Sequence, residues 1–190
     1  SALGTFSAVY FLDDCYGDRQ EHLGRPIVGL LADWDSFLGD NSRFFVAIGS
    51  NVRRSALFDS LSQRRANVAT LASVDAYISQ RSLVGSGTLI MPKAVVNADV
   101  CIGLNVIVNS GAIVEHDCII GDHSHVGPGA ILTGGAKVGA ATTIGAGAVV
   151  CPAVSVGDGV LLGAGAVATR DITQPGRYFG VPARRRGGVD

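Results

Sequence analysis

The chain has 190 residues, a formal net charge of −1 and a mean hydropathy of +0.35. Its length suits one or two domains, and the near-zero charge provides no basic field for nucleic acid. Glycine and polar residues interrupt every apolar run before it reaches the ~18 residues of a membrane span, and no charged region followed by an apolar stretch marks a secretion signal. The four cysteines show no CxxC spacing, so we expect free thiols and a cytoplasmic protein.

Residues 1–75 predict a small α/β domain. We expect a strand at FSAVYFLDD (6–14), a short helix at DWDSFLGD (33–40) and a second strand at RFFVAIGSN (43–51). A second helix is expected at NVRRSALFDSLSQRR (51–65), and a last strand at ANVATL (66–71). The second helix has Asn51 as its expected cap. This alternation is typical of a small parallel, Rossmann-like sheet. Such folds begin with a strand and a glycine-rich loop, and none is found here, so we expect the domain to lack its first βα unit.

Residues 76–173 carry a six-residue repeat that runs without a break from Ile78 to Thr173. Fifteen of the sixteen first positions are Val, Ile or Leu, with Ala168 the exception, and the fifth positions are almost all small. The second position is Gly or Asn in ten hexads, which indicates a turn at each corner. Three hexads make one triangular coil of eighteen residues. The repeat therefore predicts a left-handed parallel β-helix of about five coils, followed by a C-terminal tail over residues 174–190.

The unbroken register leaves no residues for a loop that could wall an active site. We therefore expect a neighbouring subunit to supply that wall, in a homotrimer with its sites between subunits. The exposed flat faces of such a prism give a physical reason to associate.

Three of the four histidines lie in the segment SGAIVEHDCIIGDHSHVGPGA, residues 110–130. An imidazole near its ordinary pKa suits the removal of a proton from an amine that attacks a thioester, and His116 in the motif VEHD is the best candidate base. His125 lies nine residues further on, half of one coil, so the two side chains should lie on different sides of one prism. They could meet across a trimer interface. Cys118 occupies a fifth position and should point into the core.

Several segments together resemble the PglD/NeuD family of sugar acyltransferases, over nearly the whole chain. They are YFLDD, VAIGSNVRR, LIMPKAVVNADVCIG, VIVNSGAIVEHDCIIGDHSHVGPGA and FGVPARR. The most similar branch acetylates the 4-amino group of nucleotide-linked 4-amino-4,6-dideoxy sugars, of the UDP-bacillosamine precursor or GDP-perosamine type. The resemblance implies a nucleotide sugar as substrate, acetyl-CoA as co-substrate and no metal.

The resemblance also implies roles for individual residues. His116 would accept the proton, and Asp117 would orient its ring and raise its basicity, with Glu115 the weaker candidate for that second role. Contacts to the cofactor would come from His125, Gly134, Ala146 and Ala164. Contacts to the sugar nucleotide would come from Asp13, Asp14, Gly49 and Asn51, where the amides at a helix start suit a phosphate.

Other interpretations remain open at this point. A sugar O-acetyltransferase of the sialic acid type would share the fold, and so would a non-catalytic hexapeptide scaffold. A zinc enzyme like the γ-type carbonic anhydrases needs three histidines around one ion, and the spacing of His116, His123 and His125 does not fit one tetrahedral site. His123 has no matching role and is expected to be exposed. Asp13 and Asp14 could form a solvated turn, and the Arg-rich end could bind CoA phosphates or be solvated.

Overall fold

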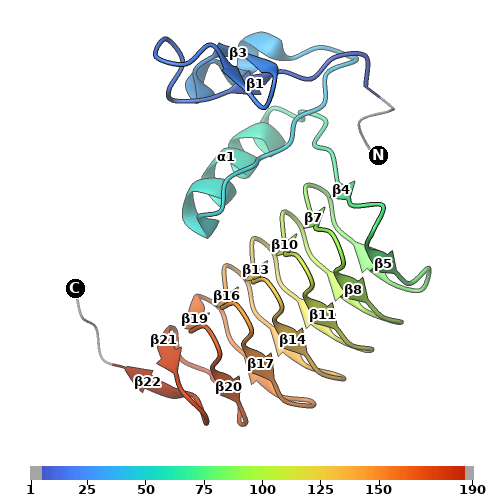
Figure 1. Ribbon diagram of the computed structural model, residues 1–190, viewed down its shortest axis with the longest axis vertical. Helices are drawn as coiled ribbons and strands as arrows, with labels where there is room; N and C mark the ends of the chain where they lie inside the picture. The colour runs from blue at the N-terminus through green and yellow to red at the C-terminus, as the bar shows by residue number, and fades with distance from the viewer. Residues whose placement is uncertain (1–5, 187–190) are drawn as a thin grey trace.

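The structure is a computed structural model that describes residues 6–186. A small α/β unit at the N-terminal end lies beside a triangular prism of short parallel strands (Figure 1). Each strand between residues 71 and 150 pairs with the strand eighteen residues further along, as in Ile107 with His125 and Ile113 with Ile131. The predicted left-handed β-helix is confirmed. Among the described residues, no helix is long and apolar enough to cross a membrane.

The prism has three sheets, which we call sheets I, II and III. Sheet I consists of β4 (Leu71–Ala72), β7 (Leu89–Ile90), β10 (Ile107–Val108), β13 (His125–Val126), β16 (Thr143–Ile144), β19 (Val160–Leu162), β21 (Gly176–Phe179) and β22 (Arg184–Arg186). Sheet II consists of β5 (Tyr77–Ile78), β8 (Val95–Val96), β11 (Ile113–Val114), β14 (Ile131–Leu132), β17 (Val149–Val150) and β20 (Val167–Ala168). Sheet III consists of β6 (Leu83–Val84), β9 (Cys101–Ile102), β12 (Ile119–Ile120), β15 (Lys137–Val138) and β18 (Ser155–Val156). The chain visits sheets I, II and III in turn, so the corners are I–II, II–III and III–I.

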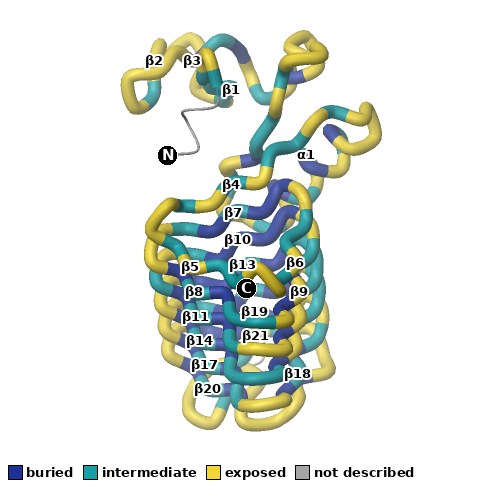
Figure 2. Tube along the Cα trace, turned by 90° about the vertical axis from the view of Figure 1, so that its right-hand side faces the viewer, coloured by how far each residue is buried: buried dark blue, intermediate teal, exposed yellow. Residues whose placement is uncertain are grey.

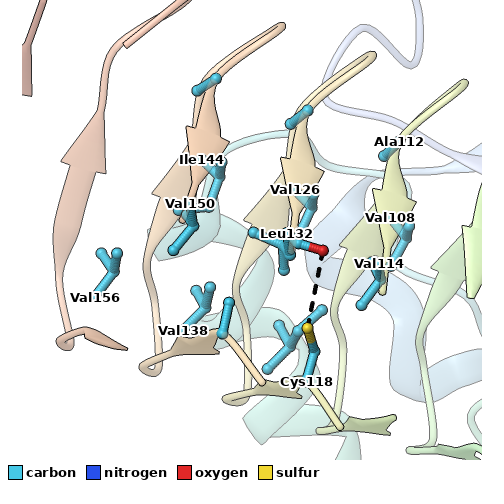
Figure 3. Packing of buried hydrophobic residues seen from close by; sticks show 14 of the residues in the cluster. Val108, Ala112, Val114, Cys118, Val126, Leu132, Val138, Ile144, Val150 and Val156 are labelled. Carbon is cyan, nitrogen blue, oxygen red and sulfur yellow. Dashed lines mark hydrogen bonds between the residues drawn. The ribbon is translucent and has the colours of Figure 1, made fainter. Parts of the chain in front are cut away.

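The core of the prism is built from the first and fifth positions of the hexads, as the repeat predicts. Val114, Val126 and Leu132 are fully buried first positions, and Ala112 and Cys118 are fully buried fifth positions. Figure 2 shows these buried stretches as a repeating band in each sheet, and Figure 3 shows the side chains stacked inside. Each coil therefore buries the apolar face of the next, which is the source of stability in a solenoid.

The left-handed turn conformation occurs at the fourth position of the hexad. The prediction that it occurs at the second position is wrong. Left-handed φ angles occur at fourth positions such as Asp117 (62°) and His123 (60°). Second-position glycines answer a different need, because the next coil passes close by. A Cβ atom on Gly121 would lie 2.6 Å from the amide nitrogen of Ala140. Glycine at these positions therefore allows close stacking of the coils.

The N-terminal unit is of the expected α/β class, but its sheet differs from the prediction. It contains β1 (Phe11–Leu12), β2 (Glu21–His22), β3 (Arg25–Gly29), the 3-10 helix η2 (Leu31–Phe37) and α1 (Asn51–Gln63). The strand order is β1-β3-β2, and only β1 and β3 are parallel, since β2 and β3 form an antiparallel hairpin. Trp34, Val46, Phe58 and Leu61 form a separate small core.

Three local predictions for this unit are wrong. Residues 66–71 form no strand of its sheet, since only Leu71 is in a strand, and that strand is β4 of sheet I. Residues 43–51 form no strand of the sheet and make one isolated bridge, Phe44 with Val68. The helix α1 is capped by Ser50 and not by Asn51, because the hydroxyl of Ser50 accepts the amide N–H of Arg53 at 3.4 Å. The side chain of Asn51 is free to bind elsewhere.

Candidate active site

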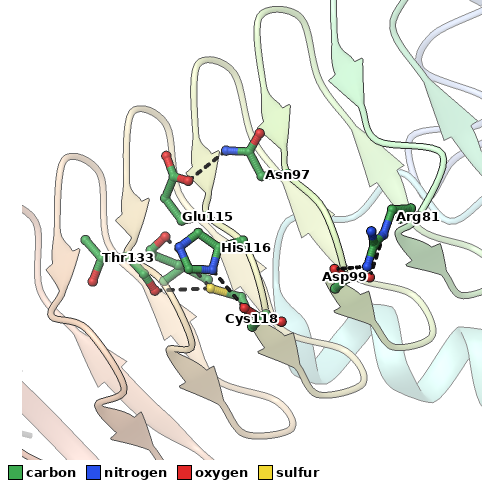
Figure 4. A network of polar contacts seen from close by, with 9 residues as sticks. Arg81, Asn97, Asp99, Glu115, His116, Cys118 and Thr133 are labelled. Atoms are coloured by element: carbon green, nitrogen blue, oxygen red, sulfur yellow. Dashed lines mark hydrogen bonds and ion pairs between the residues drawn. The ribbon is translucent and has the colours of Figure 1, made fainter.

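His116 lies on corner II–III, in the turn between β11 and β12 (Figure 4). Its Nδ1 is 2.8 Å from Oδ2 of Asp117, and its side chain is 64% exposed. The hydrogen bond to Asp117 raises the pKa of His116, with smaller contributions from the charges of Asp117 and Glu115. Because Nδ1 donates to the carboxylate, the lone pair for accepting a proton is on Nε2.

Asp117 and Glu115 take different directions from the corner. The carboxylate of Glu115 accepts a hydrogen bond from Nδ2 of Asn97 at 2.8 Å, and Figure 4 shows it pointing toward that neighbour. Asp117 is therefore the acidic residue that orients the imidazole. Asn97 was missed in the sequence, although its position eighteen residues before Glu115 is a signal of stacking in this repeat.

Cys118 has the wrong environment for a nucleophile. It is fully buried, and its Sγ lies 3.2 Å from the carbonyl oxygen of Thr133, to which it donates. Burial raises the pKa of the Cys118 thiol to about 11. Since the thiolate is the reactive form, this side chain acts as part of the core, as expected from its fifth position.

The predicted cofactor residues fall on two corners and one face. Gly134 stacks on His116 at corner II–III, where the imidazole lies directly over it. Ala146 and Ala164 are exposed on corner I–II, one coil apart, and are linked through the amide of Gly165, which donates to the carbonyl of Ala146 at 2.9 Å. One chain therefore places the imidazole of His116 and the two alanines on different edges of the prism.

His125 lies on β13 in sheet I and is half-buried. Oδ1 of Asn109 accepts the amide of Ser110, so its Nδ2 faces Nε2 of His125 at 3.0 Å. A ring nitrogen that faces an amide N–H₂ group must be unprotonated. Burial lowers the pKa of His125, and the charge of Arg54 adds to this, against a raising contact with the backbone of Gly49. His125 is thus a neutral imidazole next to the N-terminal unit.

The residues predicted to bind the sugar nucleotide converge at the start of α1. Asp14 follows β1 and pairs with Arg53 of α1 at 2.9 Å, which brings the end of that strand to the helix that follows Gly49. Asp13 accepts from the amide of Cys15 at 2.9 Å and from its thiol at 2.6 Å, and the thiol hydrogen bond is the main cause of its lowered pKa. Both carboxylates lie at an exposed strand end.

The side chain of Asn51 is engaged inside the protein. Its Nδ2 is 3.0 Å from Oγ1 of Thr143 on the prism, and its Oδ1 accepts from Arg54 at 2.8 Å. A contact of Asn51 with substrate would therefore have to come from its backbone.

Arg54 was missed in the sequence and joins the two parts of the protein. Its side chain is 1% exposed, and no carboxylate of residues 6–186 pairs with it. The guanidinium instead donates to carbonyl and amide oxygens on both parts, namely those of Ile48, Gly49, Asn51, Asn105, His123 and Ser124. This arrangement holds α1 and the Gly49 loop against corner III–I, directly before His125.

His123 also belongs to this junction, so the expectation that it would be exposed is wrong. Its side chain is 19% exposed, its ring packs edge-on against Phe58 of α1 at 5.6 Å, and its Nδ1 is 2.8 Å from Nδ2 of Asn105. In the described part of the chain, no group of three or more His, Cys, Asp or Glu side chains is placed to hold a metal ion.

Comparisons with known proteins agree with this architecture. Residues 135–170 match the family model of the bacterial transferase hexapeptide (six repeats), and residues 1–61 match the PglD N-terminal domain. No match was found among the curated proteins.

Solved structures similar to this chain include the acetyltransferase domain of PglB from Neisseria gonorrhoeae in complex with acetyl coenzyme A. It is 34% identical with a TM-score of 0.93, and the match covers 97% of this chain and 89% of that one. PerB from Caulobacter crescentus, in complex with CoA and GDP-perosamine, is 35% identical with a TM-score of 0.82, over 90% of this chain and 83% of that one. WeeI from Acinetobacter baumannii is 27% identical with a TM-score of 0.87, over 97% of this chain and 90% of that one.

Proposed function

The chain belongs to the PglD/NeuD family of hexapeptide-repeat sugar acyltransferases, and we propose that it acetylates the 4-amino group of a nucleotide-linked 4-amino-4,6-dideoxy sugar. Acetyl-CoA is the co-substrate. The observation that carries this proposal is the exposed imidazole of His116, hydrogen-bonded through Nδ1 to Asp117. The bound acetyl-CoA in the PglB domain and the GDP-perosamine in PerB support the two substrate classes.

We propose a separate role for each of three segments. Residues 1–75 hold the sugar nucleotide through Asp13, Asp14 and the Gly49 loop, and residues 76–173 hold acetyl-CoA and the base. Residues 174–190 form the C-terminal segment. The four cysteines are free, which is in keeping with the cytoplasmic location that we propose.

In the proposed reaction the amine attacks the thioester directly. The nitrogen of the sugar forms a bond to the acetyl carbonyl carbon, and Nε2 of His116 takes the proton that this nitrogen loses. Backbone amides near His125 stabilise the oxyanion of the tetrahedral intermediate. The carbon–sulfur bond then breaks, and the CoA thiolate leaves with the electron pair and is protonated. No covalent acyl-enzyme is needed, and Cys118 is not available to form one.

We further propose that each site lies between two protomers of a homotrimer. His116 is on corner II–III, whereas Ala146 and Ala164 are on corner I–II and the Gly49 loop is at corner III–I. Sheet II also presents an outward row of half-buried β-branched residues, which are Val95, Ile113, Ile131, Val149 and Val167. Burial of this row against a neighbouring protomer would cover the open side of His116 and place a different corner opposite it.

The test of the function is the release of free thiol from acetyl-CoA against a panel of UDP- and GDP-linked 4-amino sugars and matched hydroxyl acceptors. We expect turnover with at least one amino sugar and its loss in His116→Ala. Turnover with hydroxyl acceptors alone would reject N-acetylation in favour of the sugar O-acetyltransferase. Unchanged turnover in His116→Ala would reject the assigned base.

A further inference from the structure

Gly134 has a position in the repeat where glycine is not required by the backbone. It is the one glycine among the third positions of the sixteen hexads, and the others carry side chains, as at Ala98 and Pro152 on the same corner. Its φ angle is not in the left-handed region, which begins at the next residue, Gly135. The reason for glycine at this point must therefore be the space above it and not its conformational freedom.

That space is filled by the imidazole of His116. A Cβ atom on residue 134 would lie 2.8 Å from both Cε1 and Nε2 of His116, and 3.5 Å from its Nδ1. Contacts below 3.0 Å between carbon atoms are strongly repulsive. The two residues are eighteen apart, so they occupy the same place on corner II–III in two successive coils and lie side by side.

The backbone at this point has little freedom to retreat from the ring. The amide of Gly135 donates to the carbonyl of His116 at 2.9 Å, and the amide of Ala153 donates to the carbonyl of Gly134 at 3.0 Å. The ring is also held through Nδ1 by Asp117 at 2.8 Å. An added methyl group would thus have to move the ring and disturb the contact with Asp117.

We propose that Gly134 is a positioning residue. Because it has no side chain, the imidazole of His116 can lie against its backbone, with Nδ1 hydrogen-bonded to Asp117 and Nε2 open to the amine. This role rests on the proposed function and differs from the cofactor contact expected for Gly134. A cofactor contact would act on the affinity for acetyl-CoA. The space that Gly134 leaves for the ring affects the orientation and basicity of His116, and therefore kcat.

The first experiment measures the pKa of His116 by NMR of the imidazole Cε1 signals, assigned with His116→Ala, in the wild type and in Gly134→Ala. We expect the pKa of His116 to fall in the variant, because the ring loses its hydrogen bond to Asp117. The kcat should fall on the order of 10- to 100-fold, as for a misplaced catalytic group, with little change in KM for acetyl-CoA. An unchanged pKa together with a raised KM would overturn the proposal in favour of the cofactor contact.

Gly159→Ala is the matched control. It adds the same methyl group on corner III–I at a fourth position, where Ala141 on the same corner shows that alanine adopts the required left-handed φ. Its nearest neighbour is Cβ of Pro175 at an ordinary 3.7 Å. The pKa of His116 should not change in this variant, and a shift equal to that in Gly134→Ala would contradict a local effect.

A second measurement is independent of turnover and so separates this inference from the proposed function. The midpoint of thermal unfolding is compared for Gly134→Ala in the wild-type background and in the His116→Ala background, as a double-mutant cycle. The methyl group should lower Tm in the first background and not in the second, because the ring is then absent. An equal loss in both would show that the methyl meets something other than His116, and would overturn the proposal even if the enzyme acetylates amino sugars.

Discussion

The hydrogen bond of His116 to Asp117, and to a lesser extent the charge of Asp117, raises the pKa of His116, which gives a prediction for single residues. Asp117→Asn replaces the carboxylate by a neutral amide, so the pKa of His116 should fall. Because the base works only when unprotonated, activity is lost as the pH falls through that pKa. The acid limb of kcat/KM, measured between about pH 5 and about pH 9 around the ordinary range of histidine, should move to lower pH. Its plateau should fall on the order of 100-fold, because the ring is no longer oriented.

Glu115→Gln is the matched control for this profile. Glu115 makes its hydrogen bond to Asn97 and raises the pKa of His116 only through its charge, as a minor cause. Its acid limb should move less than that of Asp117→Asn. A limb that stays in place or moves to higher pH in Asp117→Asn would contradict the assigned pair.

Some residues of the candidate site could be predicted from the sequence and others could not, for a physical reason. His116 and Asp117 are adjacent, and histidine in a run of small aliphatics is conspicuous. Asn97 and Asn109 have partners eighteen and sixteen residues away, and asparagine at a second position also suits a turn. The eighteen-residue period could have indicated the contact of Asn97 with Glu115. The partner of Asn109 lies outside that period, so only the structure shows that its amide contacts His125.

At the scale of elements, the position of α1 depends on the buried guanidinium of Arg54. Burial lowers its pKa to about 10, so it remains charged at neutral pH. Arg54→Met would leave buried carbonyls on both parts without a donor, and we expect a loss on the order of 3 kcal/mol in the free energy of unfolding. The KM for the sugar nucleotide should rise more than that for acetyl-CoA, since the Gly49 loop is released. Urea unfolding and steady-state kinetics measure both.

The C-cap residue of the same helix offers a matched control. Arg64→Met removes an exposed pair with Asp35, whose 3.7 Å contact joins side chains that are 60% and 50% exposed. Exposed pairs contribute at most about 1 kcal/mol, so stability and both KM values should barely change. If Arg54→Met behaved like Arg64→Met, the hydrogen bonds of the buried Arg54 guanidinium would contribute nothing to stability.

The two parts of the chain differed in how well their elements could be predicted. The prism was predictable because each hexad repeats the same environment, so many positions give independent evidence for one period. The hairpin of β2 and β3 was missed because its turn is Leu23–Gly24, with φ angles of 49° and 70°. Such turns usually carry Asn-Gly, and leucine at the first position hides the signal. The strands of this unit are also too short to show a period.

At the scale of the whole molecule, the groups that we propose for acetyl transfer lie on separate edges of one prism. The half-exposed aliphatic row of sheet II lies next to the corner that carries His116. Its burial between protomers would remove apolar surface from water and enclose the base in the same step. These groups lie on different corners within one chain. A three-fold axis would place one corner of a protomer opposite a different corner of its neighbour and so bring the groups together.

The most direct test of this composite site is complementation between two inactive variants. His116→Ala lacks the base, and Ala164→Trp should block the cofactor corner without entering the core, because Ala164 is exposed. The two variants, carrying different tags, are produced together, and mixed trimers are isolated and assayed for thiol release. If each site takes His116 and Ala164 from different protomers, one of the three sites in every isolated mixed trimer is intact, so about a third of the wild-type activity should be restored. If one chain supplies both, every site in a mixed trimer keeps a defect, and the absence of any restored activity would contradict a site built between subunits.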